Sequence, residues 1–164
     1  MNLRLNWFAI LEGIGILAGF FYGTILLLYV WDSSHPIPPV FVLTVDPPNW
    51  TVANSNTKAV PFNEGVRIES LTREGEYMLL TGNIVGRPRG SYYVTYELKQ
   101  LDGATIIGVF DNEKNKWINS RLVGQAKDEL FFSAPKNSFQ IVLQNGLSSP
   151  NRSVLAELRV VERH

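Results

Sequence analysis

The longest apolar stretch of the chain runs from Trp7 to Trp31 and contains one charged residue, Glu12. About 20 mainly apolar residues are enough for a helix to cross the hydrocarbon core of a bilayer. Trp7 at one end, and Tyr29 and Trp31 at the other, occupy positions where aromatic side chains meet the membrane interface. A signal peptide has a shorter apolar region of about 7–15 residues, so the pattern predicts an uncleaved, single membrane-spanning helix.

The charged residues and the absence of cysteine exclude some kinds of partner, and the position of the basic residues predicts the orientation of the chain. The 164 residues have a formal net charge of zero and include no cysteine, which gives no basic surface for nucleic acid and no ligand for a thiolate metal site. Arg4 is the only basic residue before the span, and the next one after it is Lys58. The positive-inside rule therefore predicts a cytoplasmic N-terminus and a C-terminal domain on the other side of the membrane. We expect the inner membrane of a bacterium, in which case that domain is periplasmic.

One side of the predicted helix carries small residues. Gly15, Gly19 and Gly23 are spaced by four and so share one face, which Glu12 also shares. Small residues at this spacing let a second helix approach closely, and a carboxylate at membrane depth usually faces protein or water. We therefore expect these four residues to pack against transmembrane helices of other subunits. The alternative is a plain lipid anchor, with Glu12 reaching the headgroups.

The composition changes after the predicted span. Residues 1–32 hold the N-terminal tail and the helix, and residues 33–62 are rich in proline, which favours an extended linker. Within this linker, residues 40–45 are a candidate edge strand or first strand, and residues 49–58 are expected to form a loop. The remaining residues, 63–164, are expected to form one β-sandwich domain.

An alternation of apolar and polar residues dominates this C-terminal region. Turn-forming residues separate short runs with period two, which is typical of an antiparallel sandwich or barrel. In the last run, Val154, Ala156, Leu158 and Val160 are predicted to share the buried face. The predicted strands cover residues 66–70, 76–85, 91–100, 105–111, 116–118, 128–134, 138–145 and 153–162.

The order of three segments resembles a known fold. GSYYVTYELKQLDGATIIGVFDNEKNKWI, then ELFFSAPKNSFQIVLQNG, then VLAELRVVE is similar to the jelly-roll sandwich of carbohydrate-binding modules and galactose-binding-like domains. The resemblance covers roughly residues 64–162 and implies a jelly-roll fold. Members of this wider group bind sugars, lipids or proteins, so the resemblance implies a fold more than a function.

The sequence offers no catalytic motif. Histidine occurs only at positions 35 and 164, so neither a Ser-His-Asp triad nor a histidine metal cluster can be assembled within the β domain. We therefore expect a protein that is not an enzyme and that has no cofactor.

One turn is rich in oxygen ligands. Asp111, Asn112, Glu113 and Asn115 form a candidate calcium site, because Ca²⁺ prefers carboxylate and amide oxygens. Modules of the group that the chain resembles often carry a structural calcium. A solvated hairpin turn is the alternative interpretation.

Three aromatic residues are candidates for a ligand-binding or partner-binding surface, namely Trp50, Tyr93 and Trp117. A sugar is bound by an exposed aromatic face beside polar groups. The competing interpretation is packing, either in the core or in a cross-strand pair.

These features support two main hypotheses, besides a third in which the chain is a membrane-anchored adaptor for a soluble periplasmic protein. The first is a non-catalytic accessory subunit of a bacterial membrane complex, such as a photosynthetic reaction-centre, light-harvesting or respiratory assembly. Its helix would dock in the lipid bilayer, and its β domain would brace the periplasmic face. The alternative is a membrane-anchored, glycan-binding module, with Tyr93 and Trp117 as its platform.

Overall fold

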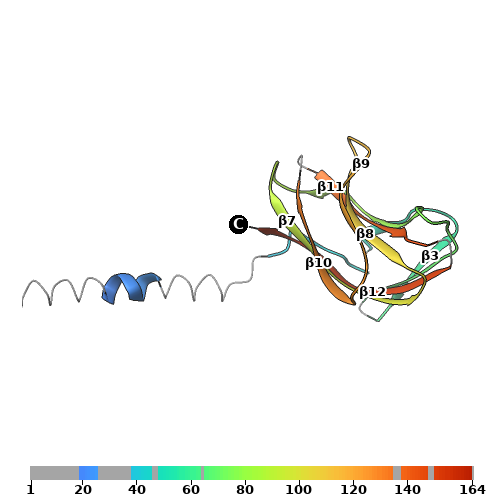
Figure 1. Cartoon of the computed structure of the whole chain (residues 1–164), viewed down its shortest axis with the longest axis horizontal. Coiled ribbons are helices and arrows are strands. Elements are labelled where there is room, and N and C mark those ends of the chain that lie inside the picture. The colour runs from blue at the N-terminus through green and yellow to red at the C-terminus, as the bar shows by residue number, and fades with distance from the viewer. Residues whose placement is uncertain are drawn as a thin grey trace, which may run out of the picture. The chain divides into compact units, whose positions relative to one another are not determined.

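A computed structural model of the chain describes residues 19–25, 38–45, 48–63, 65–134, 138–147 and 150–163. The chain divides into two compact units, Met1–Ile37 and Pro38–His164. In the first unit, residues 19–25 are helical. The second unit holds all the named strands, which form a sandwich of two antiparallel sheets (Figure 1).

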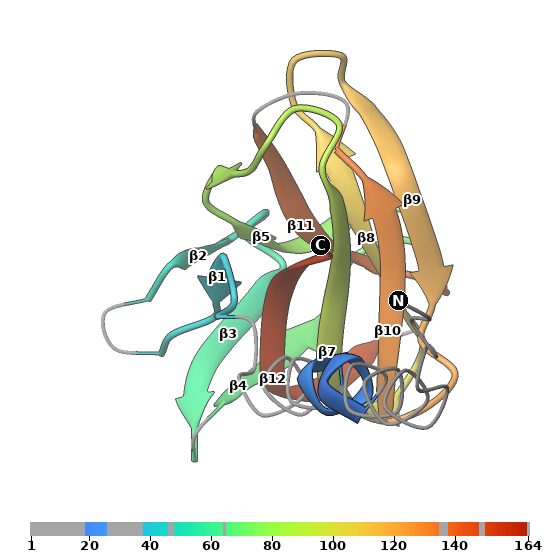
Figure 2. The same cartoon turned by 90° about the vertical axis from the view of Figure 1, so that its left-hand side faces the viewer.

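The first sheet is built around the two longest strands of the domain. β7 pairs with β12 along most of its length, so these strands lie side by side at the centre of the sheet (Figure 2). The strand order is β10 (Lys127–Ser133), β7 (Ser91–Asp102), β12 (Asn151–Arg163), β4 (Gly65–Ser70) and β3 (Thr57–Phe62), and β1 (Phe41–Val42) also pairs with β12.

The second sheet has β11 (Ser138–Asn145) at its centre. Its order is β2 (Trp50–Val52), β5 (Tyr77–Thr81), β11, β8 (Thr105–Asp111) and β9 (Lys116–Leu122), and β6 (Ile84–Val85) also pairs with β11. Connections cross repeatedly between the two sheets, since β7 and β8 follow one another but belong to different sheets. This confirms an antiparallel β-sandwich of the jelly-roll kind.

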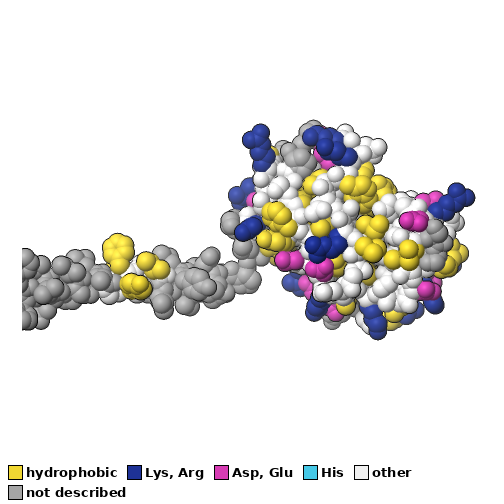
Figure 3. All heavy atoms as spheres, viewed as in Figure 1, with side chains coloured by type: hydrophobic (Ala, Val, Ile, Leu, Met, Phe, Trp, Pro, Cys, Tyr) yellow, Lys and Arg dark blue, Asp and Glu magenta, His cyan; other side chains and the backbone are white. Residues whose placement is uncertain are grey.

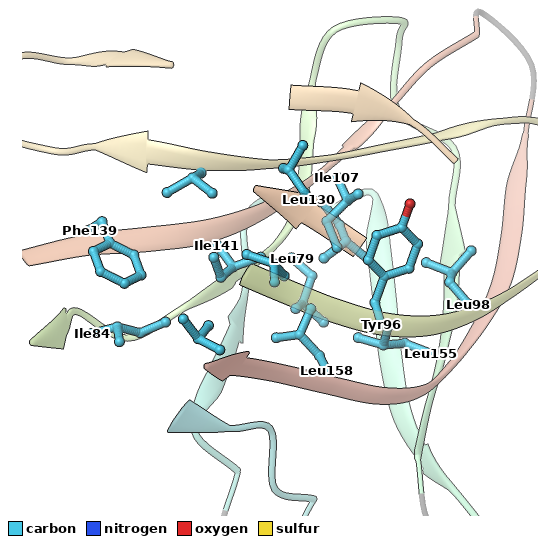
Figure 4. Close-up of a cluster of buried hydrophobic side chains, with 14 of the residues drawn as sticks. Leu79, Ile84, Tyr96, Leu98, Ile107, Leu130, Phe139, Ile141, Leu155 and Leu158 are labelled. Carbon is cyan, nitrogen blue, oxygen red and sulfur yellow. The ribbon is translucent and has the colours of Figure 1, made fainter. Parts of the chain in front are cut away.

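The core forms where the inward faces of the two sheets meet. In β7 the residues at even positions, such as Tyr92 and Leu98, are buried, as a period of two requires. Tyr92 stacks on Phe132 at a centroid distance of 5.4 Å, and Phe132 meets Phe139 edge to face at 4.8 Å. Figure 4 shows that side chains from both sheets, including Leu158 and Ile141, interdigitate between the layers.

β12 departs from regular alternation at a β-bulge. The register with β7 shifts between Leu155 and Glu157, so Ala156 has no partner on β7. The buried positions therefore change from odd before the bulge (Leu155) to even after it (Leu158), while Ala156 is exposed and Val154 is half-buried. Our expectation that Val154 and Ala156 share the buried face of Leu158 is corrected by this extra residue.

The described part of residues 33–62 belongs to the sandwich instead of forming only a linker. β1, β2 and β3 all lie in this range, and the second unit begins at Pro38. β2 and β3 are edge strands, so few of their positions face the core, and only Thr57 of β3 is fully buried. Pro61 suits an edge strand, and the few inward-facing positions explain why the pattern of residues 49–58 alone indicates a loop.

Two other expected strands have different bounds. Residues 76–85 are two strands, β5 and β6, because Gly82 and Asn83 interrupt the ladder. β9 extends to Leu122, beyond the predicted 116–118, and forms a sandwich edge with mostly exposed side chains.

A buried polar network closes one end of the sandwich. The side-chain nitrogen Nδ2 of Asn151 donates to the carbonyl oxygen of Ala104 at 2.5 Å, to Thr105 Oγ1 at 3.1 Å and to Asn145 Oδ1 at 3.3 Å. Asn145 in turn donates to the carbonyl oxygen of Thr72 at 2.7 Å. Because Asn151 lies in the first sheet and Thr105 in the second, these bonds hold the two sheets together.

Candidate ligand-binding site

The outer face of the first sheet presents one residue in two from each strand. In β7 the outward residues are Tyr93, Thr95 and Glu97, each half-buried by its neighbours. The register places Phe131 of β10 opposite Tyr93 on one side and Val161 of β12 opposite it on the other. These residues therefore form one continuous surface across β10, β7 and β12, which we call the outer sheet face.

An aromatic pair lies on the outer sheet face. The rings of Tyr93 and Phe131 have centroids 5.2 Å apart and planes inclined by 53°. Phe131 is 42 % exposed. The guanidinium carbon of Arg163 is 6.0 Å from the centroid of Tyr93 and 5.9 Å from that of Phe131, which is the outer limit of a cation–π contact. Two aromatic rings, the exposed Phe131 and the half-buried Tyr93, thus lie beside a cation.

Charged residues continue the outer sheet face beyond the rings. Glu97 of β7 lies directly opposite Glu157 of β12, an arrangement that is unfavourable unless each carboxylate has a cation. Both have one, since Lys127 Nζ is 2.8 Å from Glu97 Oε2 and Arg159 Nε is 2.7 Å from Glu157 Oε1. The hydrogen bond to Glu97 raises the pKa of Lys127.

The surface is hollowed on both sides of this acidic pair. Glu97 and Glu157 line a hollow of about 190 Å³ towards β10, which also includes Lys127. They also line a second hollow of about 400 Å³ towards β3 and β4, which includes Phe62 and the bulged residue Ala156. On the face of the domain drawn in Figure 3, hydrophobic and charged side chains lie next to one another. Because charged side chains line the two hollows together with Phe62 and Ala156, the outer sheet face offers apolar contact beside hydrogen-bonding groups.

A cross-sheet ion pair supports the edge of this face. Arg121 of β9 donates to Asp128 Oδ2 of β10 at 2.8 Å, although the two strands belong to different sheets. The backbone N–H of Glu129 and the Arg121 guanidinium lower the pKa of Asp128. Burial, followed by the nearby Asp128 carboxylate, raises the pKa of Tyr96. The pair links β10, the strand of Phe131, to the edge strand β9 of the other sheet.

The three aromatic residues singled out from the sequence do not come together. Tyr93 lies on the outer sheet face, whereas Trp117 lies on the outer side of the second sheet, in edge-to-face contact with Tyr77 and Phe110 at 5.7 and 5.4 Å. Trp50 packs against the core, and its indole N–H donates to the carbonyl oxygen of Thr44 at 3.0 Å. One flat ligand therefore cannot lie on both Tyr93 and Trp117.

The oxygen-rich turn folds as a hairpin between β8 and β9. Asp111 is fully buried, and its Oδ1 accepts hydrogen bonds from the backbone N–H groups of Glu113 and Lys114, both at 3.1 Å. The side chain of Asn112 donates to Asn83 at 2.8 Å, and Asn115 has a φ of 51°. Among the described residues no three His, Cys, Asp or Glu side chains are grouped to hold a metal ion. The other oxygen of this carboxylate, Asp111 Oδ2, is buried without a hydrogen-bond partner, so calcium binding at this turn stays a prediction.

The predicted helix-packing residues are only partly covered by the structure. Glu12 and Gly15 lie outside the described residues. Gly19 and Gly23 lie in the helical segment, and a side chain added at either would meet nothing within 4 Å. Within the described parts of the chain, no helix is both long and apolar enough to cross a membrane.

Sequence reasoning missed Phe131, Arg163 and the acidic pair. Phe131 and Phe132 are adjacent and equally apolar, but only Phe132 shares the buried face of Leu130. A phenylalanine on the solvent face of a strand was the one sign of this surface in the sequence. Nothing in the sequence indicated that Arg163 would lie beside Tyr93, because that neighbourhood depends on the pairing of β12 with β7.

Comparison with known proteins identifies the fold. No family model and no curated protein matches the chain. Among solved structures, the carbohydrate-binding module "BiXyn10A CBM1" has a TM-score of 0.57 at 11 % identity, with 76 % of this chain and 99 % of that chain covered. The chain therefore shares the β-sandwich fold of this module.

Two further modules agree with this. The module CBM6cm-2 of the Cellvibrio mixtus lichenase 5A, solved with cellotriose, has a TM-score of 0.52 at 11 % identity, covering 77 % of this chain and 100 % of its own. The C-terminal CBM6 of the Zobellia galactanivorans enzyme LamC has a TM-score of 0.53 at 12 % identity, covering 74 % and 98 %. At these identities the likeness establishes the β-sandwich fold, as the sequence resemblance implied, and leaves the ligand to be argued from the surface.

Proposed function

We propose that the β domain is a non-catalytic glycan-binding module and that its ligand lies on the outer sheet face. The observation that carries the proposal is the Tyr93–Phe131 pair, half-buried and exposed respectively, beside the charged groups of two hollows. A pyranose ring has an apolar face and a rim of hydroxyl groups. The aromatic pair suits the apolar face, and the Glu97, Glu157 and Arg159 side chains suit the hydroxyl groups.

The dimensions of the face agree with an oligosaccharide. From Tyr93 to Glu97 the strand advances four residues, about 13 Å at roughly 3.3 Å per residue. This is enough for more than one sugar ring. The likeness to modules such as the one solved with cellotriose also supports a sugar ligand, and these findings favour glycan binding over a subunit of a photosynthetic or respiratory assembly.

The N-terminal segment is proposed to tether this module to a membrane. The sequence of the predicted span remains the main argument. The exposure of the described helical side chains adds support, since Phe20, Phe21, Tyr22 and Ile25 are 59–77 % exposed in the chain by itself. Side chains of this kind need lipid or protein to cover them.

The test is binding of the full-length chain to an array of plant, algal and bacterial polysaccharides. The chain is purified in lauryldimethylamine oxide, because detergents with sugar headgroups would compete for the site. We expect binding to at least one glycan, and loss of that binding in Tyr93→Ala and in Phe131→Ala.

Trp117→Ala is the matched comparison, because it removes an aromatic side chain from the outer side of the other sheet. Its folding is checked by circular dichroism, and Trp117→Phe replaces it if the alanine variant unfolds. Retained binding in the Trp117 variant supports the proposal. Loss of binding in that variant alone would move the site to the second sheet, and no binding to any glycan would overturn the function.

A further inference from the structure

The charges around the Tyr93–Phe131 pair are arranged asymmetrically. Arg163 lies at one end of the pair, next to Ser91, where β7 begins. At the other end, Glu129 lies two residues from Phe131 on the same face of β10. A ligand on the two rings therefore has a cation at one end and a carboxylate at the other.

The cation beside the rings differs from the other cations of the outer sheet face. Lys127 and Arg159 are each neutralised by a glutamate at 2.8 and 2.7 Å. Arg163, in contrast, has no carboxylate within 4.0 Å among the residues that the structure describes, and its printed contacts are with the two rings. An arginine beside a flat apolar surface keeps its donors available for a bidentate bond to an anion.

Nearby charge does not cancel this cation. The adjacent Glu162 is 3.2 Å from Arg87 and is engaged by it. Among the described residues, the end of the outer sheet face that holds Arg163 therefore has a cation without a carboxylate partner, while the Glu97–Glu157 end is balanced by its own ion pairs.

From this arrangement we infer that the site selects a glycan that bears a carboxylate, such as a uronic acid polymer, and binds that carboxylate at Arg163 with the sugar ring on Tyr93 and Phe131. The inference rests on the proposed glycan-binding function and adds the chemical class of the ligand. Glu129 fixes the orientation, because a carboxylate placed at its end of the rings would be repelled.

The experiment compares acidic polysaccharides with neutral partners of the same backbone. Polygalacturonate, alginate and glucuronoxylan are each paired with their carboxyl-reduced form, and the affinity of the full-length chain is measured for both. A hydrogen bond to a charged group corresponds to a gain of about tenfold to a hundredfold. We expect a preference of that size for the acidic member of at least one pair, decreasing as salt concentration rises.

Two variants show whether Arg163 causes the preference. Arg163→Gln should bind the acidic and the carboxyl-reduced polymer equally, whereas Arg163→Lys should keep part of the preference. Arg152→Gln is the matched control, since Arg152 is on the same strand but pairs with Asp102 at 3.3 Å. It should leave the preference unchanged.

The outcomes separate the inference from the proposed function. Equal binding of acidic and neutral partners, or a preference that survives Arg163→Gln, would overturn the inference while leaving glycan binding in place. Failure of every polymer, acidic and neutral, to bind the parent chain would overturn both.

Discussion

Replacing Phe131 and Phe132 one at a time by alanine compares two neighbouring residues on opposite faces of β10. Phe132 is 3 % exposed and contacts both Tyr92 and Phe139 in the core. Phe131 is 42 % exposed and contacts Tyr93. The two substitutions remove the same atoms, so any difference in the free energy of unfolding reports the different burial of the two side chains.

The expected losses differ at least twofold. Burial of a whole phenylalanine side chain contributes about 1.5–3 kcal/mol. A little more than half of Phe131 is covered and solvent fills the space that it leaves, so Phe131→Ala should cost about 1–2 kcal/mol. Phe132→Ala also leaves a cavity and loses two ring contacts, so it should cost about 4–5 kcal/mol, the upper part of the range for such changes.

Urea unfolding of the full-length chain, followed by tryptophan fluorescence, measures these losses. With a slope of about 1.5 kcal/mol per molar urea, the midpoint should fall by about 3 M for Phe132→Ala and by about 1 M for Phe131→Ala. If Phe132→Ala does not fold, Phe132→Leu retains most of the apolar volume and still shows which of the two positions contributes more to stability. Equal shifts, or a larger shift for Phe131→Ala, would refute the register of β10, because a slip by one residue exchanges the two faces.

Two further changes test the contacts that join the sheets. Asp128→Asn should lower the free energy of unfolding at neutral pH, and this free energy should then decrease less as the pH is lowered. Because the pKa of Asp128 is lowered in the folded chain, its carboxylate stabilises the fold above the unfolded pKa of about 3.9, and this stabilisation is lost as the pH falls through the folded pKa. Urea midpoints of the parent chain and of the variant, measured from pH 7 to pH 3, test this. The same pH dependence in both chains would contradict the prediction. Asn151→Ala should lower the free energy of unfolding by about 2–4 kcal/mol, because it leaves several buried hydrogen-bonding groups without a partner; a loss below about 1 kcal/mol would show that the network adds little to stability.

Period-two alternation was enough to predict two of the strands that pair on both sides. The predicted ranges 105–111 and 138–145 coincide with β8 and β11, which lie inside the second sheet. Such strands bury one face completely, so their pattern is strong. The edge strands β2 and β3 bury only a few side chains and leave a weak pattern, which is why residues 49–58 were interpreted as a loop.

The candidate site was harder to predict because it is made by register. Tyr93 could be found from its phase in β7, but its neighbours Phe131 and Arg163 come from strands that are distant in sequence. Trp50 and Trp117 were equally good candidates by residue type. The sequence does not state which sheet a strand joins, and this alone decides that Trp117 faces away from Tyr93.

The bulge at Ala156 is the feature that alternation could least predict, and it shapes the acidic end of the site. It reverses the phase of β12 so that Glu157, and not its neighbour, faces Glu97. Bulges re-aim side chains in this way near functional surfaces. Gly65 of β4 accommodates the bulge, because a side chain there would overlap the carbonyl oxygen of Leu155 and come within 2.8 Å of the Ala156 Cα.

Gly65 and the bulge should therefore be coupled, and a double-mutant cycle measures the coupling. Gly65→Ala should cost about 1–3 kcal/mol through overpacking, whereas Gly124→Ala, with nothing within 4 Å, should cost little. Deletion of Ala156 restores regular alternation between Leu155 and Glu157, so the deleted chain should fold and tolerate Gly65→Ala better than the parent chain does. Additive losses in urea midpoints would show that Gly65 is required for some other reason than the bulge. Since Gly65, Ala156 and Glu157 line the same hollow, the deletion should also weaken glycan binding, because it changes the shape of that hollow while Glu157 stays opposite Glu97.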